Sequence, residues 1–474
     1  MKKIFIKLSL FVLGVFLVLS PFGVFLLYAN TQKHVYSKTY YAALVDKTNY
    51  LKSLKKEKKI VLIGGSNVAF GFDSELLENE FNDYKVVNYG LYAMLGTKIM
   101  MDLAIDSINE GDLVFVIPEI NEQSMSLYFN ASATLKAIED DFSILNKIDS
   151  NNRNSVYAEY FNFVSERGKY KEIIEPGETV YRRDSFNKYG DISYAFADKN
   201  IMMLHYDPTM KVDFNLKIND EFACYVNAFA RRVEKKKATC FYTWSPVNNL
   251  SADNSGLDDF YWNVRKALNM HVVGNPEEFI FDNHYFYDSN FHLNNSGAKL
   301  RTLRFIETFN RDILNTYISK ENEYPSTPEY ETENIDVSIN SETADMFNYD
   351  EIEGKLEIAS IKNEYKDVNE ILLPSVVNHM VVAGIKEESF KDSNVNSIII
   401  PETIKYIKDG AFKDSNVISV KILSNKPSSI NVSWVGGLLE GAKEEIVIYV
   451  PDESLLEFKN DYYWGAYRDN MKGY

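Results

Sequence analysis

Cysteine is almost absent from this sequence, which contains only Cys224 and Cys240 among its 474 residues. These two could pair in an oxidising compartment, but they cannot form the framework of a disulfide-rich domain. No cysteines have the spacing of a zinc site. The Gly-x-Ser-x-Gly pentapeptide of the α/β-hydrolases is also missing, because Val68 stands where its second glycine would be. With 45% hydrophobic residues, the chain can instead bury a large core in more than one domain.

Basic residues are scarce relative to acidic ones. The chain has 51 Lys and Arg against 68 Asp and Glu, which gives a formal net charge of -17. A surface this acidic repels phosphate backbones, so we expect no nucleic-acid partner. The sequence also has no motif for a cofactor, and we expect none.

Charged residues are missing from one long run, Leu8 to Tyr28, which follows three lysines. The run is long enough to span a bilayer, and the lysines predict a cytoplasmic amino terminus. A cleaved signal peptide is the alternative, although its apolar region is usually shorter and residues 27–29 match a cleavage site poorly. We expect residues 1–30 to be a cytoplasmic tip and transmembrane anchor, with the bulk of the chain on the outer side of the cell membrane.

Apolar runs alternate with helical patterns over residues 31–318. This alternation predicts an α/β fold with a parallel sheet covered by helices on both faces. The expected strands are 60–63, 84–88, 113–117, 239–244 and 279–281, and the expected helices are 95–108, 221–235, 257–268 and 296–318. Residues 122–217 are too many for one crossover and too aromatic for disorder, so we interpret them as an insertion that shapes a substrate cleft.

The composition changes after the last of these helices. Residues 319–348 are rich in Glu, Thr, Ser, Asn and Pro, which predicts an acidic, extended and solvated linker. An internal repeat follows, because residues 388–395 return as residues 410–417 with a period of twenty-two. Repeats of that length with one strand each stack on their neighbours and bury a continuous apolar face.

The repeat has a recognisable pattern of Ile-Pro, a variable loop, Ile and Gly-Ala-Phe, seen at Ile400-Pro401, Ile407 and residues 410–412. Residues 349–474 therefore resemble the BspA-like leucine-rich repeats of bacterial surface proteins. The resemblance implies a small β-solenoid that binds a protein or a glycan. Since only two copies are clear, we expect the terminal segments to cap much of the apolar face.

Ser66 follows Gly64 and Gly65 at the end of the first expected strand. Open parallel sheets bind ligands at the carboxyl ends of their strands, and backbone amides beside glycines can face an oxyanion there. The alternative is that Ser66 only caps a helix, but residues 71–74 offer a better cap. We predict that Ser66 is a nucleophile and that its amide is an oxyanion donor.

His292 lies in a loop just before an amphipathic helix, and Asp288 precedes it by four residues. Asp288 could hold the imidazole and stabilise the imidazolium that forms when Ser66 attacks. The simplest alternative is a surface histidine, and Asp282 with His284 is a rival pair. His284, Asp288 and His292 could also be metal ligands, but the residues between them do not favour a helix, so we expect no metal.

These residues carry a second resemblance. Residues 58–318 are similar to the SGNH, or GDSL-type, hydrolase superfamily, particularly its membrane-anchored cell-envelope branch with the D-alanyl-lipoteichoic acid transfer protein and alginate acetyltransferase-like proteins. The resemblance implies a three-layer sandwich with a parallel flavodoxin-like sheet and a Ser66, His292 and Asp288 triad. It further implies oxyanion donors at Ser66, Gly90 and Asn121. For Gly90, the alternative is a simple β-turn.

The sequence departs from the superfamily pattern in three places. Gly64-Gly65-Ser66 replaces Gly-Asp-Ser, and the interval from Asp288 to His292 is one residue longer than usual. In the third block, Asn121 is a weak match to the usual asparagine, and Glu119 stands where it could occupy the pocket instead. Loss of one oxyanion donor costs ~10² to 10³ in rate, so the site could be impaired or differently specialised.

We therefore expect an extracytoplasmic serine esterase or O-acyltransferase that acts on acyl esters, chiefly acetyl esters, of cell-envelope glycans. Water as the acceptor makes an esterase, and a sugar hydroxyl makes a transferase. A second hypothesis is a catalytically silent surface scaffold or adhesion protein that binds through its leucine-rich repeats. A third is a protein that assists a partner membrane acyltransferase.

Overall fold

The computed structural model describes residues 24–474 except positions 26, 177–178, 194–196, 200–210, 254, 330–341, 353–354, 379, 433–436, 443–445 and 462. Most of the expected membrane anchor thus lies outside the described residues. Within the described part of the chain, no helix combines the length and the apolar character needed to cross a bilayer.

The amino-terminal unit is built on a five-stranded parallel sheet with the order β2-β1-β3-β5-β8. Its strands are β1 (Lys59–Gly64), β2 (Lys85–Gly90), β3 (Leu113–Ile117), β5 (Thr239–Tyr242) and β8 (His271–Val272). They are nearly continuous apolar runs because helices cover both faces of the sheet. The expected α/β fold with parallel strands is confirmed. Since β1 lies between β2 and β3, the connection from β1 to β2 and the connection from β2 to β3 run in opposite directions across the sheet. Such a reversal opens a crevice at the carboxyl end of β1.

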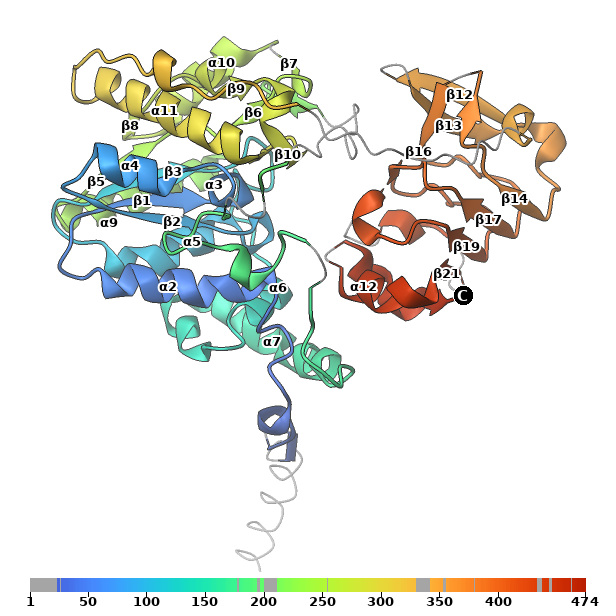
Figure 1. The fold of residues 1–474 in the computed structure, drawn as a ribbon. Coiled ribbons are helices and arrows are strands. Elements are labelled where there is room, and N and C mark those ends of the chain that lie inside the picture. Colours follow the sequence, from blue (N-terminus) through green and yellow to red (C-terminus); the bar gives the residue numbers. More distant parts are fainter. Residues whose placement is uncertain are drawn as a thin grey trace, which may run out of the picture.

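Helices α4 (Ser74–Glu80) and α11 (Asn295–Asp312) lie on one side of this sheet, and α2 (Ala43–Ser53) and α5 (Thr97–Ala104) lie on the other (Figure 1). The other helices of this unit are α3 (Ser66–Ala69), α6 (Ala131–Ala137), α7 (Ser150–Arg167), α9 (Asp220–Lys235) and α10 (Leu257–Ala267). Short strands pair outside the main sheet: β4 (Val212–Asp213) with β7 (Ala252–Asp253), β6 (Val247–Asn248) with β9 (Ile280–Phe281), and β10 (Phe286–Ser289) with β11 (His292–Leu293).

Two expectations about this unit were wrong. The run 279–281 is not the fifth strand of the main sheet, since β9 pairs with β6 and the fifth position belongs to the two-residue β8. The last helix does not reach residue 318, because α11 ends at Asp312 and the chain turns at Asn315, whose φ is 53°. Asparagine tolerates this left-handed conformation, which cannot continue a helix.

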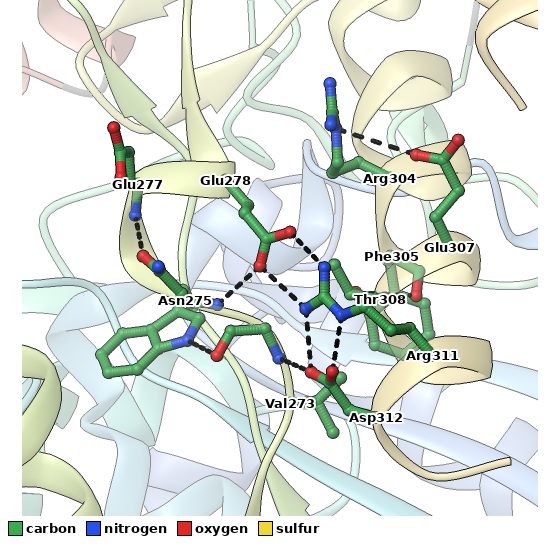
Figure 2. Close-up of polar contacts among 12 residues, drawn as sticks. Val273, Asn275, Glu277, Glu278, Arg304, Phe305, Glu307, Thr308, Arg311 and Asp312 are labelled. Carbon is green, nitrogen blue, oxygen red and sulfur yellow. Dashed lines mark hydrogen bonds and ion pairs between the residues drawn. The ribbon is translucent and has the colours of Figure 1, made fainter. Parts of the chain in front are cut away.

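The carboxyl end of α11 is anchored to the loop that follows β8 (Figure 2). The Arg311 guanidinium donates to both Glu278 carboxylate oxygens, at 2.6 and 3.1 Å, and the Asp312 carboxylate accepts from the Gly274 amide at 2.8 Å. At the other end of α11, the Asn294 side chain caps the helix by accepting from the Gly297 amide at 2.9 Å. The helix therefore holds the β10–β11 ribbon before it, which contains His292, in a fixed place.

The carboxyl-terminal unit has its own hydrophobic core, separate from that of the α/β unit. One sheet contains β14 (Glu370–Leu372), β17 (Ser397–Ile400), β19 (Ser419–Ile422), β21 (Val447–Val450) and β22 (Met471–Gly473), all parallel. The other contains β12 (Phe347–Ile352), β13 (Lys355–Ile361), β16 (Met380–Ile385), β18 (Tyr406–Ile407) and β20 (Asn431–Val432), and β15 (Val376–Val377) pairs with β16. Helix α12 (Leu455–Asn460) follows β21.

Strand pairing in this unit follows the repeat seen in the sequence. Ile398 in β17 pairs with Val420 in β19, and Phe390 and Phe412 are fully buried with their ring centroids 5.8 Å apart. The same sheet continues on both sides of these two copies, where the pairing strands are separated by longer stretches of chain. The parallel sheet thus extends beyond the two copies that the sequence makes visible.

The segment between the units is only partly as expected. Its start does not lie free in solvent: Lys320 forms an ion pair with Glu80 at 2.9 Å, and the Tyr324 hydroxyl donates to Glu307 on α11. The first residues of the linker are therefore attached to the α/β unit. Cys224 and Cys240 do not pair in the structure, where Cys224 is exposed on α9 and Cys240 is buried in β5.

Candidate active site

Ser66 lies at the carboxyl end of β1, as the first residue of α3, and is 7% exposed. The turn before it requires glycine, since a Cβ on Gly64 would lie 2.4 Å from the Ile117 carbonyl oxygen. The Asn67 side chain closes the turn by accepting from the Gly65 amide at 3.0 Å. At the start of a helix the Ser66 amide has no intrahelical acceptor, so it is available to a ligand in the crevice.

His292 and Asp288 reach Ser66 from the β10–β11 ribbon. The His292 Nε2 atom is 2.7 Å from Ser66 Oγ, and its Nδ1 atom is 2.8 Å from Asp288 Oδ1. The register of the ribbon is irregular between Phe286 and Ser289. A bulge of this kind redirects side chains, which accommodates the additional residue between the aspartate and the histidine. The structure therefore brings the three predicted catalytic residues into one hydrogen-bonded chain.

Two side chains fix the imidazole from other directions. The Phe70 ring, just after α3, stacks on His292 with a centroid distance of 4.3 Å and an interplanar angle of 7°. The Tyr181 hydroxyl donates to Asp288 Oδ2 at 2.6 Å and lies 3.2 Å from His292 Nδ1. Burial and the Asp288 charge raise the pKa of Tyr181 well above its usual value, so the hydroxyl keeps its proton. Tyr181 comes from the insertion, which was expected to shape the cleft.

Arg301 connects helix α11, which follows His292, with the turn that contains Ser66. It is fully buried on α11 and donates to the main-chain oxygens of Asn67 at 2.9 Å and Trp244 at 3.0 Å. Burial lowers the pKa of its guanidinium to about 9. Because one side chain binds both carbonyls, it holds the Ser66 turn and α11 at a fixed separation. The serine-to-imidazole distance depends on that separation.

Glu119, just after β3, makes the most unusual contact in the site. Its Oε1 atom lies 3.1 Å from Ser66 Oγ and accepts from the Asn67 amide at 3.3 Å, and the side chain is nearly buried. Ser66 has one hydroxyl proton, which cannot be donated to His292 and Glu119 at once. The Glu119 carboxylate thus competes with the His292 imidazole for the hydrogen bond of the Ser66 hydroxyl.

The other two predicted oxyanion donors have partners of their own. The Gly90 amide, at the end of β2, donates to Asn88 Oδ1 at 3.1 Å. The Asn121 side-chain amide donates to Glu119 Oε2 at 3.3 Å. Gly90 is instead required for packing, because a Cβ there would lie 2.4 Å from Val68 Cβ. Among the predicted donors, the Ser66 amide is thus the one best placed to receive an oxyanion.

The rival pair lies apart from this cluster. His284 Nδ1 contacts Asp282 Oδ1 at 2.5 Å, and both side chains are partly exposed. His284 does not join Asp288 and His292 as a metal ligand. The residues that the structure describes contain no cluster of three or more His, Cys, Asp or Glu suited to a metal ion.

Sequence reasoning missed three residues of the site: Phe70, Tyr181 and Arg301. Arg301 left one signal, a charged residue on the apolar side of an amphipathic helix, which indicates a buried polar contact. Tyr181 left none, since it lies in an insertion without a motif. Comparison with known proteins gave no further guide, since no protein-family model and no curated protein matches this chain.

Proposed function

We propose that this chain is an SGNH-type serine esterase or O-acyltransferase that acts on acyl esters, chiefly acetyl esters, of cell-envelope glycans. The observation that carries the proposal is the Ser66, His292 and Asp288 chain, with contacts of 2.7 and 2.8 Å. A nucleophile, a base and an orienting carboxylate in this order are what acyl transfer through a covalent intermediate requires. The strand order β2-β1-β3-β5-β8 agrees with the flavodoxin-like sheet of that superfamily.

In the proposed reaction Ser66 Oγ attacks the ester carbonyl while His292 Nε2 takes its proton. Asp288 accepts a hydrogen bond from the Nδ1–H group throughout and stabilises the imidazolium. The tetrahedral intermediate collapses when His292 gives the proton to the leaving alkoxide oxygen, which leaves an acyl group on Ser66. His292 then takes a proton from water or a sugar hydroxyl, whose oxygen attacks the acyl carbon. The bond to Ser66 breaks and the serine regains its proton.

Glu119 has to leave its place before the oxyanion forms. Its contacts with the Ser66 hydroxyl and the Asn67 amide occupy the position where negative charge develops. When the ester oxygen displaces the carboxylate, the amides of Ser66 and Asn67 become the oxyanion donors. The structure then corresponds to a resting state, with a side chain of the protein in place of substrate.

Labelling of the full-length protein with a fluorophosphonate serine probe tests this proposal. Labelling should be lost in Ser66→Ala and in His292→Ala and retained in His284→Ala, because only the first two variants disrupt nucleophile activation. Hydrolysis of 4-nitrophenyl acetate should follow the same order. If labelling is unchanged in Ser66→Ala, the reactive group lies elsewhere and the proposal is wrong.

Glu119 favours a second candidate function, that of a catalytically silent surface protein. A permanently bound carboxylate would block the site, and residues 349–474 would then act alone as a BspA-like leucine-rich repeat solenoid with a protein or glycan ligand. The parallel strands and the buried Phe390 and Phe412 support such a solenoid. Absence of labelling in the folded wild-type protein would favour this function. In either case the uncharged run 8–28 would attach the chain to the membrane, where a partner acyltransferase could supply acyl groups.

A further inference from the structure

A cavity of about 550 Å³ lies between the α/β unit and the carboxyl-terminal unit. One wall comes from residues 36–41 and the insertion of the α/β unit, and the other comes from residues 457–469 beyond the last full repeat. The volume is in the range of sites for small organic ligands. Lys169 and Asp469 form an ion pair of 3.1 Å across the boundary, so both units contribute to one site.

Tyrosine is the most frequent residue type in the wall on the α/β side, where Tyr36 and Tyr40 are almost fully buried and the others are more exposed. The cavity is lined by Tyr36, Tyr40, Tyr41, Tyr170 and Tyr181. The ring centroids of Tyr36 and Tyr170 are 5.9 Å apart. The guanidinium carbon of Arg468, from the other unit, lies 3.8 Å from the centroid of the Tyr170 ring. Tyrosine offers an apolar ring face together with a hydroxyl. This combination suits a pyranose, whose C–H face stacks on aromatic rings while its hydroxyls form hydrogen bonds.

The charges around the cavity argue against an anionic ligand. Four basic and four acidic side chains line it, although the chain as a whole carries a formal net charge of -17. Several of these charges are already paired, as in Lys136 with Glu166 at 3.1 Å. A phosphodiester polymer would need an excess of basic groups, which the lining does not have. A neutral ligand rich in hydroxyls fits this balance.

Tyr181 belongs both to the lining of the cavity and to the catalytic cluster. Its hydroxyl contacts both Asp288 and His292, while its ring lies at the cavity wall. Tyr463 of the carboxyl-terminal unit stacks edge-on against the same ring, with a centroid distance of 6.2 Å. Burial, and next the Asp288 charge, raise the pKa of Tyr463 above its usual value.

We infer that this cavity binds a neutral oligosaccharide segment and presents it to Ser66, with the carboxyl-terminal unit forming half of the site. The inference rests on the proposed function and adds the class of substrate and the second wall of its site. The repeat unit then has a role in substrate selection, which connects the two parts of the chain. Because basic and acidic side chains are equal in number in the lining, we expect the site to prefer neutral glycans over phosphodiester polymers.

Binding by the full-length Ser66→Ala protein tests the inference without turnover. The probes are neutral trisaccharides of glucose, galactose, mannose, rhamnose and N-acetylglucosamine, with a glycerol phosphate oligomer for comparison, measured by saturation-transfer NMR and calorimetry. We expect at least one neutral trisaccharide to bind. Tyr170→Ala should weaken that binding about tenfold, as truncation of an aromatic anchor does.

Ala466→Trp gives an independent variant. Ala466 is exposed at the cavity wall on the carboxyl-terminal unit. A large side chain there fills the cavity without disturbing the hydrophobic core of either unit, so it should abolish trisaccharide binding. Tyr317→Ala removes a tyrosine that is 86% exposed outside the cavity and should leave binding unchanged. Binding of the glycerol phosphate oligomer alone, no binding of any neutral probe, or equal binding by Ala466→Trp overturns the inference.

Failure of the inference is distinguishable from failure of the proposed function. Serine-probe labelling of the wild-type protein without trisaccharide binding would remove only the oligosaccharide site. Trisaccharide binding without labelling in the wild-type protein would keep the site and remove only the esterase or transferase.

Discussion

Two carboxylate–imidazole pairs lie within eleven residues of each other, Asp282 with His284 and Asp288 with His292. In both pairs the carboxylate contacts Nδ1 of the ring. Their surroundings differ, because the side chains of the first pair are 47% and 33% exposed and those of the second are 13% and 10% exposed. The contact between carboxylate and imidazole is therefore common to a surface pair and to a candidate catalytic pair.

The second pair is distinguished by what lies on its other sides. His292 Nε2 faces the Ser66 hydroxyl, and the Phe70 ring covers one face of the imidazole. The Tyr181 hydroxyl holds the second oxygen of the carboxylate. A ring held this way has one tautomer and one direction of proton transfer. The enclosing residues are thus what distinguishes the proposed general base from the surface pair.

The largest expected effect separates the two histidines. His292→Ala should lower ester hydrolysis and probe labelling by on the order of 10⁴, because it removes the imidazole, 2.7 Å from Ser66 Oγ, that takes the serine proton in the proposed reaction. His284→Ala, the matched control, should retain activity within about twofold, as expected of a surface side chain. Rates with 4-nitrophenyl acetate measure both. Equal losses in the two variants would mean that the difference in burial has no catalytic meaning.

The aspartates should differ in the same direction but less strongly. Asp288→Asn should lower kcat by about 10³, since the neutral amide no longer stabilises the imidazolium. The loss is smaller than for His292→Ala because the Tyr181 hydroxyl, 3.2 Å from Nδ1, still orients the ring. Asp282→Asn is the control and should have wild-type kcat. Steady-state kinetics of the two variants would contradict this account if Asp282→Asn were the slower enzyme.

The main strands, and the meeting of Ser66 with His292 and Asp288, could be predicted from the sequence, because apolar runs and positions at strand ends are local patterns. Ser66 was placed by two glycines after an apolar run, and a parallel sheet brings strand ends to one edge. The five-stranded sheet was predicted correctly except for β8, which has only two residues and leaves no periodic pattern. The repeat was visible only where adjacent copies have equal length, as between Phe390 and Phe412.

The contacts that complete the site could not be predicted. The Tyr181 contact with Asp288 joins residues more than a hundred positions apart, and nothing in the insertion marks that tyrosine. Glu119 was noticed as a departure from the superfamily pattern, but its hydrogen bond to the nucleophile depends on how β1 and β3 are paired. Side-chain position at a strand end is set by tertiary packing, which local sequence patterns do not determine.

Substitution of Glu119 tests whether its carboxylate slows the proposed reaction at Ser66. Glu119→Gln removes a carboxylate 3.1 Å from Ser66 Oγ and offers an amide donor to the oxyanion. We expect kcat/KM to rise by roughly 10², the lower end of the effect of one oxyanion donor. Glu122→Gln changes an exposed neighbour by the same atoms and should have no effect. A fall in kcat/KM of Glu119→Gln would show instead that the carboxylate is needed to position the serine.

The smallest expected effect concerns Tyr181, which has no counterpart beside the exposed pair Asp282 and His284. Tyr181→Phe removes one hydrogen bond to the Asp288 carboxylate and keeps the ring at the cavity wall. A hydrogen bond to a charged group contributes about 1.5 to 3 kcal/mol, and water can replace part of it, so kcat should fall by about tenfold. KM for a glycan ester should stay the same because the ring remains, whereas Tyr317→Phe should change neither constant. If KM rises while kcat is kept, then Tyr181 acts on the substrate and not on the triad, and burial and the stacked Phe70 ring are enough to separate the two pairs.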